Sequence, residues 1–261
     1  MSVSLVAVPG VGTFQMYTHE KGDKYISRQI SEHGVWEPFE SRLVARLLKP
    51  GDVFLDLGAN IGYYTLLAAR ACGPGGAVFA FEPEPGNFRL LLRNLELNGI
   101  RNVTAVNAAA DAATGRTALF LSEDNQGDHR IYAGDGRSAP VEVPAVALDD
   151  WFAGRDTRID LVKMDTQGSE ARIIDGMAGL IESNRDRIRM IVEFWPFGLA
   201  GAGDSARGLV ERLRRFGLAV QKIDETHSEP VPTTWEQLLQ EAETLYRPAT
   251  QNFTNLLLSP R

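Results

Sequence analysis

Cysteine is almost absent from this sequence, since Cys72 is the only one in 261 residues. A single thiol cannot form an internal disulfide, so a disulfide-stapled scaffold is excluded. Long apolar runs are also missing. No stretch approaches the roughly 18 residues of a membrane helix, and residues 1–10 lack the pattern of a signal peptide. We therefore expect a soluble, cytoplasmic protein with no membrane partner.

Positive charge is in short supply as well. The chain has 27 Lys and Arg against 34 Asp and Glu, a net charge of −7, and an isoelectric point near 5.2. Proteins that bind many nucleic-acid phosphates need the opposite balance, so we expect no nucleic-acid partner. The remaining composition, with 44 % hydrophobic and 23 % charged residues, is typical of a globular fold and excludes a disordered chain.

Strands and helices alternate along most of the chain. Val53–Leu57 is a short β-rich run followed by a glycine-rich turn and an apolar helix at 61–72. The same alternation predicts strands at 77–81, 103–107, 159–164 and 189–194, and helices at 85–98, 169–182 and 205–216. This order is typical of an α/β fold in which helices cover both faces of a parallel sheet.

Both ends of the chain and one internal segment depart from this alternation. Strands at 218–223 and 252–258, with a helix at 235–245, fit a last strand inserted antiparallel. Residues 117–146 replace a helix by two β-like runs, which predicts a hairpin insertion. Residues 1–49 predict a lead-in with a hairpin and a helix at 37–48. With no repeat or linker, we expect a single domain over 1–261 with a Rossmann-like core at 50–261.

The most informative stretch follows the first core strand and runs Asp56-Leu-Gly58-Ala-Asn60-Ile-Gly62. An open parallel sheet binds its ligand at the carboxyl ends of its strands, which is where this turn lies. A dinucleotide fold would have G-x-G-x-x-G here, with a middle glycine close to the pyrophosphate. This chain has Asn60 at that place and a carboxylate at the start, which favours a ligand with a cationic part and no pyrophosphate.

S-adenosylmethionine is such a ligand. Glu82 ends the second core strand, where an acidic side chain can accept both ribose hydroxyl hydrogens. Asp111 follows the third strand and is placed to accept from the adenine amino group. Alone, each residue also fits an ordinary turn or a solvated strand end. Three carboxylates at the ends of three consecutive strands together predict a site for S-adenosylmethionine.

These residues resemble the FkbM family of class I S-adenosylmethionine-dependent methyltransferases. The segments that carry the resemblance, in order, are Glu37-Pro38, Asp52–Thr65, Ala80–Phe88, Asn94–Asn98, Leu148–Asp150, Lys163–Glu170 and Ile191–Glu193. Within Lys163–Glu170, Thr166 and Ser169 stand where the family pattern has an aliphatic residue and Ala. The charged positions of that segment are intact.

The resemblance implies a seven-stranded, mostly parallel sheet with an antiparallel last strand and helices on both faces. It also implies S-adenosylmethionine as cofactor and O-methylation of a hydroxyl on a small natural product, sugar or glycan. The cofactor-binding residues expected from the turn, the strand ends and the matching segments are Glu37, Asp56, Gly58, Asn60, Gly62, Thr65, Glu82, Asn87 and Asp111.

Methyl transfer to a hydroxyl needs a group that accepts the hydroxyl proton. Asp165, at the end of the fourth core strand, is the first candidate, and Lys163 and Glu193 are the next catalytic candidates. Lys163 also fits a plain charge partner of Asp165. Two or three of the carboxylates could hold a divalent ion, but no histidine accompanies them in the sequence, so we expect no metal.

Acceptor-binding candidates are His33 in the lead-in, Glu170 and Trp195. Each has a structural alternative: a surface histidine, a carboxylate that favours a helix N-terminus, and a packed core ring. At the level of function, three alternatives remain open beside O-methylation. They are N-methylation of an amine or peptide, nicotinamide-dependent oxidation, and binding of S-adenosylmethionine without catalysis.

Overall fold

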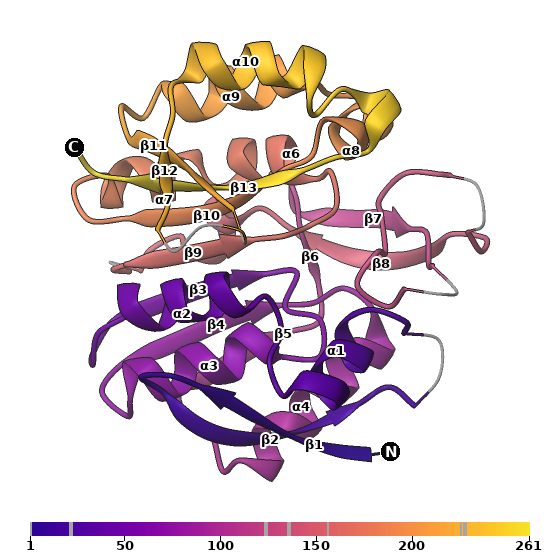
Figure 1. The fold of residues 1–261 in the computed structure, drawn as a ribbon, viewed down its shortest axis with the longest axis vertical. Helices are drawn as coiled ribbons and strands as arrows, with labels where there is room; N and C mark the ends of the chain where they lie inside the picture. The colour runs from indigo at the N-terminus through magenta and orange to yellow at the C-terminus, as the bar shows by residue number, and fades with distance from the viewer. Residues whose placement is uncertain are drawn as a thin grey trace.

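The computed structural model describes residues 2–20, 23–122, 125–134, 137–155, 157–224, 226 and 229–261. Its central sheet has the strand order β12-β11-β13-β10-β9-β3-β4-β5 (Figure 1). The strands are β3 (Val53–Leu57), β4 (Ala77–Phe81), β5 (Val103–Val106), β9 (Leu161–Met164), β10 (Arg189–Phe194), β11 (Ala219–Ile223), β12 (Val231–Pro232) and β13 (Thr254–Ser259).

The last strand, β13, lies between β10 and β11 and is antiparallel to both. The five strands from β10 to β5 run parallel to one another. The predicted α/β fold with an antiparallel last strand is therefore confirmed. The seven expected strands are extended by the two-residue strand β12, which pairs with β11 at the edge of the sheet.

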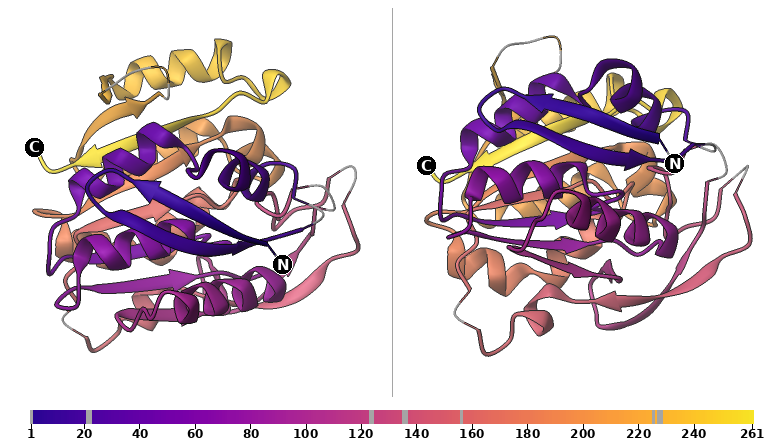
Figure 2. Two further views of the ribbon diagram at one scale, coloured as in Figure 1. Left: turned by 60° about the horizontal axis from the view of Figure 1, so that its bottom comes forward. Right: turned by 90° about the horizontal axis from the view of Figure 1, so that it is seen from below.

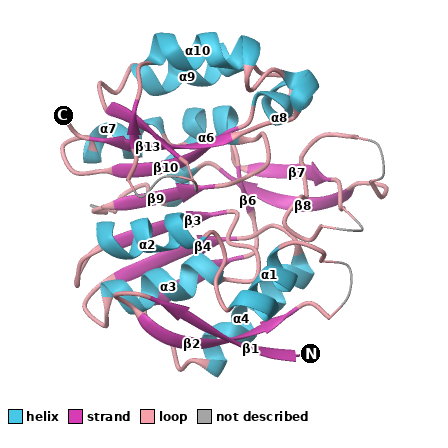
Figure 3. Ribbon diagram, in the orientation of Figure 1, coloured by secondary structure: helices cyan, strands magenta, loops and turns pink. Residues whose placement is uncertain are grey.

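Helices cover both faces of the sheet (Figure 3). One face packs against α1 (Ile26–His33), α2 (Pro38–Leu47), α3 (Tyr63–Cys72) and α4 (Pro85–Leu97). The other packs against α5 (Leu148–Trp151), α6 (Glu170–Gly176), α7 (Ala178–Asn184), α8 (Pro196–Gly201), α9 (Ala206–Arg214) and α10 (Trp235–Thr244). Strand side chains alternate between the faces: Phe54 packs on the α2 and α3 side, and Leu55 on the other.

Several helices differ from the prediction, and α5 was not expected at all. The helix expected at 169–182 is divided into α6 and α7 at Met177, whose φ of −130° is not helical. Gly176, just before it, lies so close to the backbone of Asp111 that any side chain there would overlap the Asp111 carbonyl. Helix α8 was not predicted, and Pro196 occupies its first position. A short 3₁₀ helix, η1, spans Pro248–Thr250 ahead of β13.

The lead-in forms the expected hairpin from β1 (Ser2–Val8) and β2 (Gly12–Thr18), which are antiparallel. Figure 2 shows the hairpin as a separate two-stranded layer on the outside of the molecule. Val6, Phe14 and Met16 are buried against the core on the α2 and α3 side. The polar stretch that follows contains α1, which the sequence pattern did not reveal.

The predicted insertion lies in a second, smaller sheet with the order β6-β8-β7. Its strands are β6 (Ala109–Ala110), β7 (Gly115–Leu119) and β8 (Val141–Val146), and β7 pairs antiparallel with β8. Residues 125–134, between β7 and β8, include Gln126, which lies at the carboxyl edge of the central sheet. Within the described ranges, no helix has the length and apolar character needed to cross a membrane.

Candidate active site

The turn after β3 has the unusual backbone that its glycines predicted. Gly58, Asn60 and Gly62 all have positive φ, at 85°, 51° and 91°. A side chain on Gly58 would overlap the backbone carbonyl of Asp165, so the turn after β3 packs directly on the chain that leaves β9. The Asp165 N–H also donates to the Leu57 carbonyl at 3.1 Å. The two loops are therefore held against each other at the carboxyl edge of the sheet.

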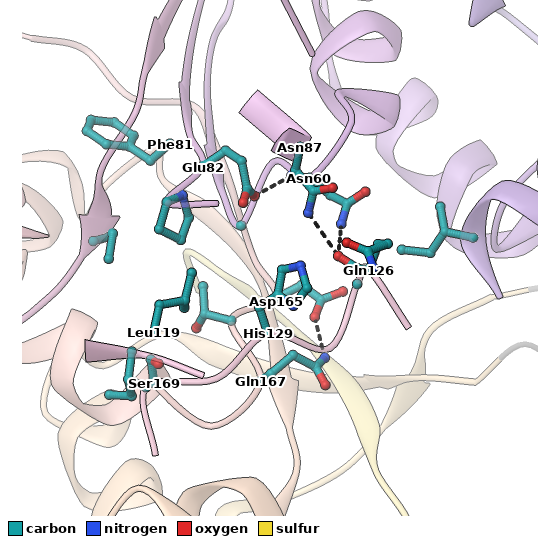
Figure 4. Close-up of a pocket in the computed structure, with 18 residues that line it drawn as sticks. Asn60, Phe81, Glu82, Asn87, Leu119, Gln126, His129, Asp165, Gln167 and Ser169 are labelled. Carbon is teal, nitrogen blue, oxygen red and sulfur yellow. Dashed lines mark hydrogen bonds between the residues drawn. The ribbon is translucent and has the colours of Figure 1, made fainter. Parts of the chain in front are cut away.

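A cavity of about 670 Å³, including its opening to solvent, lies at this edge (Figure 4). Five of the predicted site residues line it: Gly58, Asn60, Glu82, Asn87 and Asp165. Apolar side chains that include Phe81, Ala110 and Leu119 form another part of the wall. The wall thus combines a few polar groups with apolar side chains, as small-molecule sites usually do.

Glu82 is 4 % exposed and held by two backbone donors. Its Oε2 accepts from the Asn60 N–H at 2.7 Å, and its Oε1 accepts from the Glu84 N–H at 2.8 Å. Burial raises the pKa of Glu82 to about 8, although the two backbone hydrogen bonds act in the opposite direction. Each carboxylate oxygen has a second lone pair, so the side chain can still accept two hydroxyl hydrogens.

The insertion closes one side of the cavity, which sequence reasoning did not foresee. Gln126 lies between β7 and β8, and its backbone carbonyl accepts from Asn60 Nδ2 at 2.8 Å and from Asn87 Nδ2 at 2.9 Å. Gly127 and His129 of the same segment also line the cavity. The segment is polar and glycine-rich, and nothing in its pattern identifies its partners. Asn60 and Asn87 were expected to bind cofactor, and here they anchor the insertion.

A row of polar side chains crosses the α2-facing side of the sheet at the same edge. Asp56 of β3 is in register with Lys163 of β9, and Glu193 of β10 with Asn255 of β13. All four residues are buried. Side chains two positions apart on a strand point to the same face of the sheet. Each of these residues has an apolar neighbour two positions away that packs on the α2 and α3 side, such as Leu161 for Lys163.

Lys163 is the positive centre of this row. Its Nζ lies 2.9 Å from Glu40 Oε1 and 3.4 Å from Asp165 Oδ2, and 4.5 Å from the centre of the Tyr64 ring. Burial alone would lower its pKa, but Glu40, Asp165 and Glu37 outweigh that effect and raise it well above the usual value. Lys163 is a fixed ammonium, which agrees with the charge-partner alternative.

Asp56 and Glu37 are turned away from the cavity. Thr65 donates to Asp56 Oδ2 at 2.5 Å beneath the turn, and burial raises the pKa of Asp56 to about 6. Glu37 precedes α2 with φ 42°, and its carboxylate accepts from the Tyr64 hydroxyl at 2.7 Å. Burial, and next the charge of Glu40, raise the pKa of Glu37 to about 8. Gly62 and Thr65 belong to the turn and to the start of α3, and neither lines the cavity.

Asp165 differs from these groups because it faces the cavity. Its side chain is 29 % exposed, and Gln167 Nε2 donates to its Oδ1 at 2.9 Å. The same amide donates to Glu193 Oε1 at 3.1 Å. Burial, and next the charges of Asp165 and Glu170, raise the pKa of Glu193 well above its usual value. Gln167 was not predicted, and its positive φ of 55° is invisible in the sequence.

Besides Lys163, Glu193, Glu37, Asp56, Gly62 and Thr65, four more predicted residues lie outside the cavity wall. Both oxygens of the Asp111 carboxylate accept hydrogen bonds from the Arg172 guanidinium, at 2.7 and 2.9 Å. The carboxylate that was expected to accept from the adenine amino group is therefore already paired. Glu170 is fully buried and accepts from the Thr166 and Gly168 N–H groups, so it stabilises the loop after β9. Neither arrangement supports the binding role that the sequence suggested.

His33 and Trp195 are the other two. His33 is exposed in the last turn of α1, as its surface-histidine alternative anticipated. Trp195 is 6 % exposed, its Nε1 donates to the Gln251 carbonyl at 3.0 Å, and its ring packs on the guanidinium of Arg130. Among the described residues, no group of three or more His, Cys, Asp or Glu is arranged to hold a metal ion.

Comparison with known proteins decides which ligand this geometry serves. Residues 56–218 match the model of the methyltransferase FkbM domain, and this span includes the glycine turn, Glu82 and Asp165. The chain belongs to the FkbM methyltransferase family. It is a methyltransferase, and its cofactor is S-adenosylmethionine. The nicotinamide alternative is thereby set aside.

The chain is similar to two curated methyltransferases and to one solved structure. A protein from Beauveria bassiana (strain ARSEF 2860) named Methyltransferase 1 is 28 % identical over 67 % of this chain and 76 % of its own length. The 31-O-demethyl-FK506 methyltransferase FkbM of Streptomyces tacrolimicus is 31 % identical over 56 % of this chain and 65 % of its own length. The crystal structure of methyltransferase FkbM from Methylobacillus flagellatus KT aligns with a TM-score of 0.47 and 14 % identity, over 84 % of this chain and 50 % of that one.

The cavity residues fit the cofactor. Glu82 offers two buried carboxylate oxygens with spare lone pairs for a ribose diol. The apolar wall of Phe81, Ala110 and Leu119 suits a flat purine ring. No side chain fits at Gly58, so this turn presents only backbone atoms at the end of the cavity where Asp165 lies.

Proposed function

We propose that this chain is an O-methyltransferase that acts on a hydroxyl of a small natural product, sugar or glycan. The observation that carries the proposal is the position of Asp165. It presents a partly exposed carboxylate to the cofactor cavity, at the end of β9 and beside the turn after β3. The site offers a proton acceptor where a reacting hydroxyl would lie.

Within this proposal, Glu82 binds the ribose hydroxyls and the apolar wall binds the adenine. S-adenosylmethionine supplies, when bound, a methyl group on a positively charged sulfur. The residues of the chain hold the acceptor oxygen in line with that methyl group, and positioning of this kind accounts for most of the rate enhancement in such a displacement. Asn60 and Asn87 contribute by holding the insertion over the cavity.

Asp165 is the proposed general base. It accepts the proton of the acceptor hydroxyl as the oxygen forms its bond to the methyl carbon and the carbon–sulfur bond breaks. Lys163 and Gln167 fix the carboxylate at distances of 3.4 and 2.9 Å, so these are positioning residues. Because the Asp165 side chain is partly exposed, it can return the proton to solvent. Glu193 is linked to Asp165 only through Gln167 and acts as part of this support.

One comparison supports oxygen as the acceptor atom. The Streptomyces relative is named 31-O-demethyl-FK506 methyltransferase, and that name refers to a methyl group on an oxygen. The net charge of −7 disfavours a nucleic-acid substrate, so a small molecule or glycan is the proposed partner. We propose a cytoplasmic location on the same sequence grounds.

The test is Asp165→Asn, assayed for radiolabelled methyl transfer to a panel of hydroxyl- and amine-bearing compounds. We expect the transfer rate to fall by about 10²–10⁴-fold, because general-base catalysis contributes that much. Binding of adenosylhomocysteine, measured by calorimetry, should change little. The matched control is Asp186→Asn, whose side chain is 98 % exposed and remote from the cavity in sequence and fold.

Full activity of Asp165→Asn would show that Asp165 is not the general base. Analysis of the methylated product decides the rest of the proposal. A methyl ether supports it, whereas a methylated amine as the preferred product would make the chain an N-methyltransferase.

A further inference from the structure

A second hollow lies on the same edge of the sheet, on the other side of the polar row from the cofactor cavity. It measures about 1,200 Å³ including its opening. It is enclosed by the start of α2, the end of β11 and the start of β13. The mechanism described above uses none of this space. We call it the β11–β13 groove.

A continuous chain of polar side chains connects the groove to Asp165. Asn255 and Glu40 line the groove, and Asn255 Nδ2 donates to Glu40 Oε2 at 2.6 Å. Glu40 Oε1 lies 2.9 Å from Lys163 Nζ, which lies 3.4 Å from Asp165 Oδ2. Asp165 lines the cofactor cavity. A single lysine side chain therefore separates the groove from the proposed base.

The walls of the groove carry three aromatic rings. Trp36 and Tyr246 are half-buried, and the Tyr246 ring is fixed edge-on against Phe194 at 6.1 Å. Phe253 is 54 % exposed, which is unusual for a large apolar side chain. Aromatic faces of this kind bind the C–H face of a saturated ring, while polar groups around them fix the orientation of its substituents.

The polar groups of the groove are mostly acidic. Glu37, Glu40 and Asp224 line it, against one lysine, Lys222. Lys222 is already paired with Glu241, at 2.7 and 2.9 Å. Carboxyl groups accept hydrogen bonds from hydroxyl groups, and ionised ones also repel other anions. Glu37, with its pKa raised to about 8, acts near neutral pH as an acceptor alone. The lining thus favours an uncharged, hydroxyl-bearing ligand over one that carries a carboxylate or phosphate.

We propose that the β11–β13 groove binds the methyl acceptor, and that this acceptor presents an uncharged hydroxylated ring. The ring stacks on Trp36 and Phe253, and its hydroxyls donate to Glu37 and Asp224. One hydroxyl is directed toward Glu40 and Asn255, the groove end of the polar chain that leads through Lys163 to Asp165. This assignment rests on the proposed O-methyltransferase function and adds the place and the chemical class of its substrate.

The experiment uses the full chain with saturating adenosylhomocysteine and two probes that differ in one charge. Methyl β-D-glucopyranoside is neutral, and methyl β-D-glucuronide carries a carboxylate on the same ring. Saturation-transfer NMR should show transfer to the ring hydrogens of the glucoside. We expect affinity for the glucuronide to be weaker by about fivefold or more, as one like-charge contact near a surface predicts.

Three variants locate the binding. Phe253→Ala should weaken glucoside binding by about threefold to tenfold, the contribution of one aromatic contact. Asp224→Asn should reduce the discrimination between the two probes. The control is Leu92→Ala, an exposed apolar residue of α4 at 44 % exposure, which should leave both results unchanged.

The groove assignment is overturned if the glucoside does not bind, if the glucuronide binds equally well, or if Phe253→Ala binds the glucoside as the wild type does. These outcomes are separate from failure of the proposed reaction. Glucoside that binds in the groove but is methylated at no oxygen, in the presence of S-adenosylmethionine, would contradict O-methylation and leave the binding site in place.

Discussion

We propose that cofactor recognition depends most on Glu82, because it is the only carboxylate in the described cavity wall besides Asp165. Above the Glu82 pKa of about 8, changing Glu82 to Gln keeps the shape of the side chain and removes a charged acceptor of two ribose hydroxyls, so the titration is made at about pH 9. Hydrogen bonds to a charged group contribute about 1.5–3 kcal/mol, so the Kd for adenosylhomocysteine should rise by about tenfold to a hundredfold. Calorimetric titration measures this.

Glu96→Gln on the exposed side of α4 is the matched control for that titration. An unchanged Kd in Glu82→Gln would place the ribose elsewhere in the cavity. A similar loss in Glu96→Gln would show a general effect of removing negative charge.

Glu82 also makes the stability of the ligand-free protein depend on pH. Its pKa is raised to about 8 by burial, whereas in the unfolded chain it has the ordinary value of about 4.3. Between these values the folded state binds more protons than the unfolded state, so stability falls as pH rises from about 5 to about 8. One such group contributes a slope of up to about 1.4 kcal/mol per pH unit.

Urea unfolding at several pH values tests this point. The wild type should lose stability across that range more steeply than Glu82→Gln, which has no group to titrate there. Parallel curves for the two proteins would mean that Glu82 is not protonated in the folded state. Glu37, with its pKa also raised to about 8, remains in both proteins and cancels in the comparison.

At the residue scale, prediction from sequence succeeded where topology alone determines position. Gly58, Asn60, Glu82 and Asp165 follow the ends of adjacent strands, so they must meet at one edge. Side-chain direction was not accessible. Asp111 pairs with Arg172, which is 61 residues away, and no local pattern reveals that contact.

At the scale of elements, the insertion between β7 and β8 determines access to the cavity. Asn87→Ala removes one of the two side-chain donors to the Gln126 carbonyl and also a contact with His19. The segment around Gln126 should then open more often. We expect faster amide hydrogen exchange at 125–131 by about threefold to tenfold, which corresponds to one hydrogen bond of about 1 kcal/mol.

Asn98→Ala provides the control for this exchange experiment. Asn98 also lies at the end of α4, but its side chain donates to the Gln15 carbonyl of the β1–β2 hairpin. Its loss should speed exchange in the hairpin and leave residues 125–131 unchanged. If Asn87→Ala left those residues equally protected, the insertion would be held by other contacts.

The elements themselves were largely predictable, because their apolar periods are regular. The exceptions have long-range causes. The division between α6 and α7 lies beside the close contact of Gly176 with Asp111, and the loop before α6 is shaped by the buried carboxylate of Glu170. Such contacts form only when distant segments fold together, so they cannot be predicted from local periodicity.

At the scale of the whole molecule, the acidic character of the chain has a defined location. Asp56, Glu82, Asp165 and Glu193 lie at the carboxyl edge of one sheet, and Asp165, together with Glu40, contacts Lys163, which is the single buried ammonium in the described part of the chain. Desolvation of like charges is costly, which is why several of these carboxyls have raised pKa values. A bound cationic cofactor would offset part of that cost.

The most direct test is a crystal structure of the protein with adenosylhomocysteine. The account predicts that both ribose hydroxyls donate to the Glu82 carboxylate, that the adenine lies against Leu119, and that the sulfur faces Asp165. A complex in which the sulfur points away from Asp165, or in which Glu82 does not contact the ribose, would contradict it.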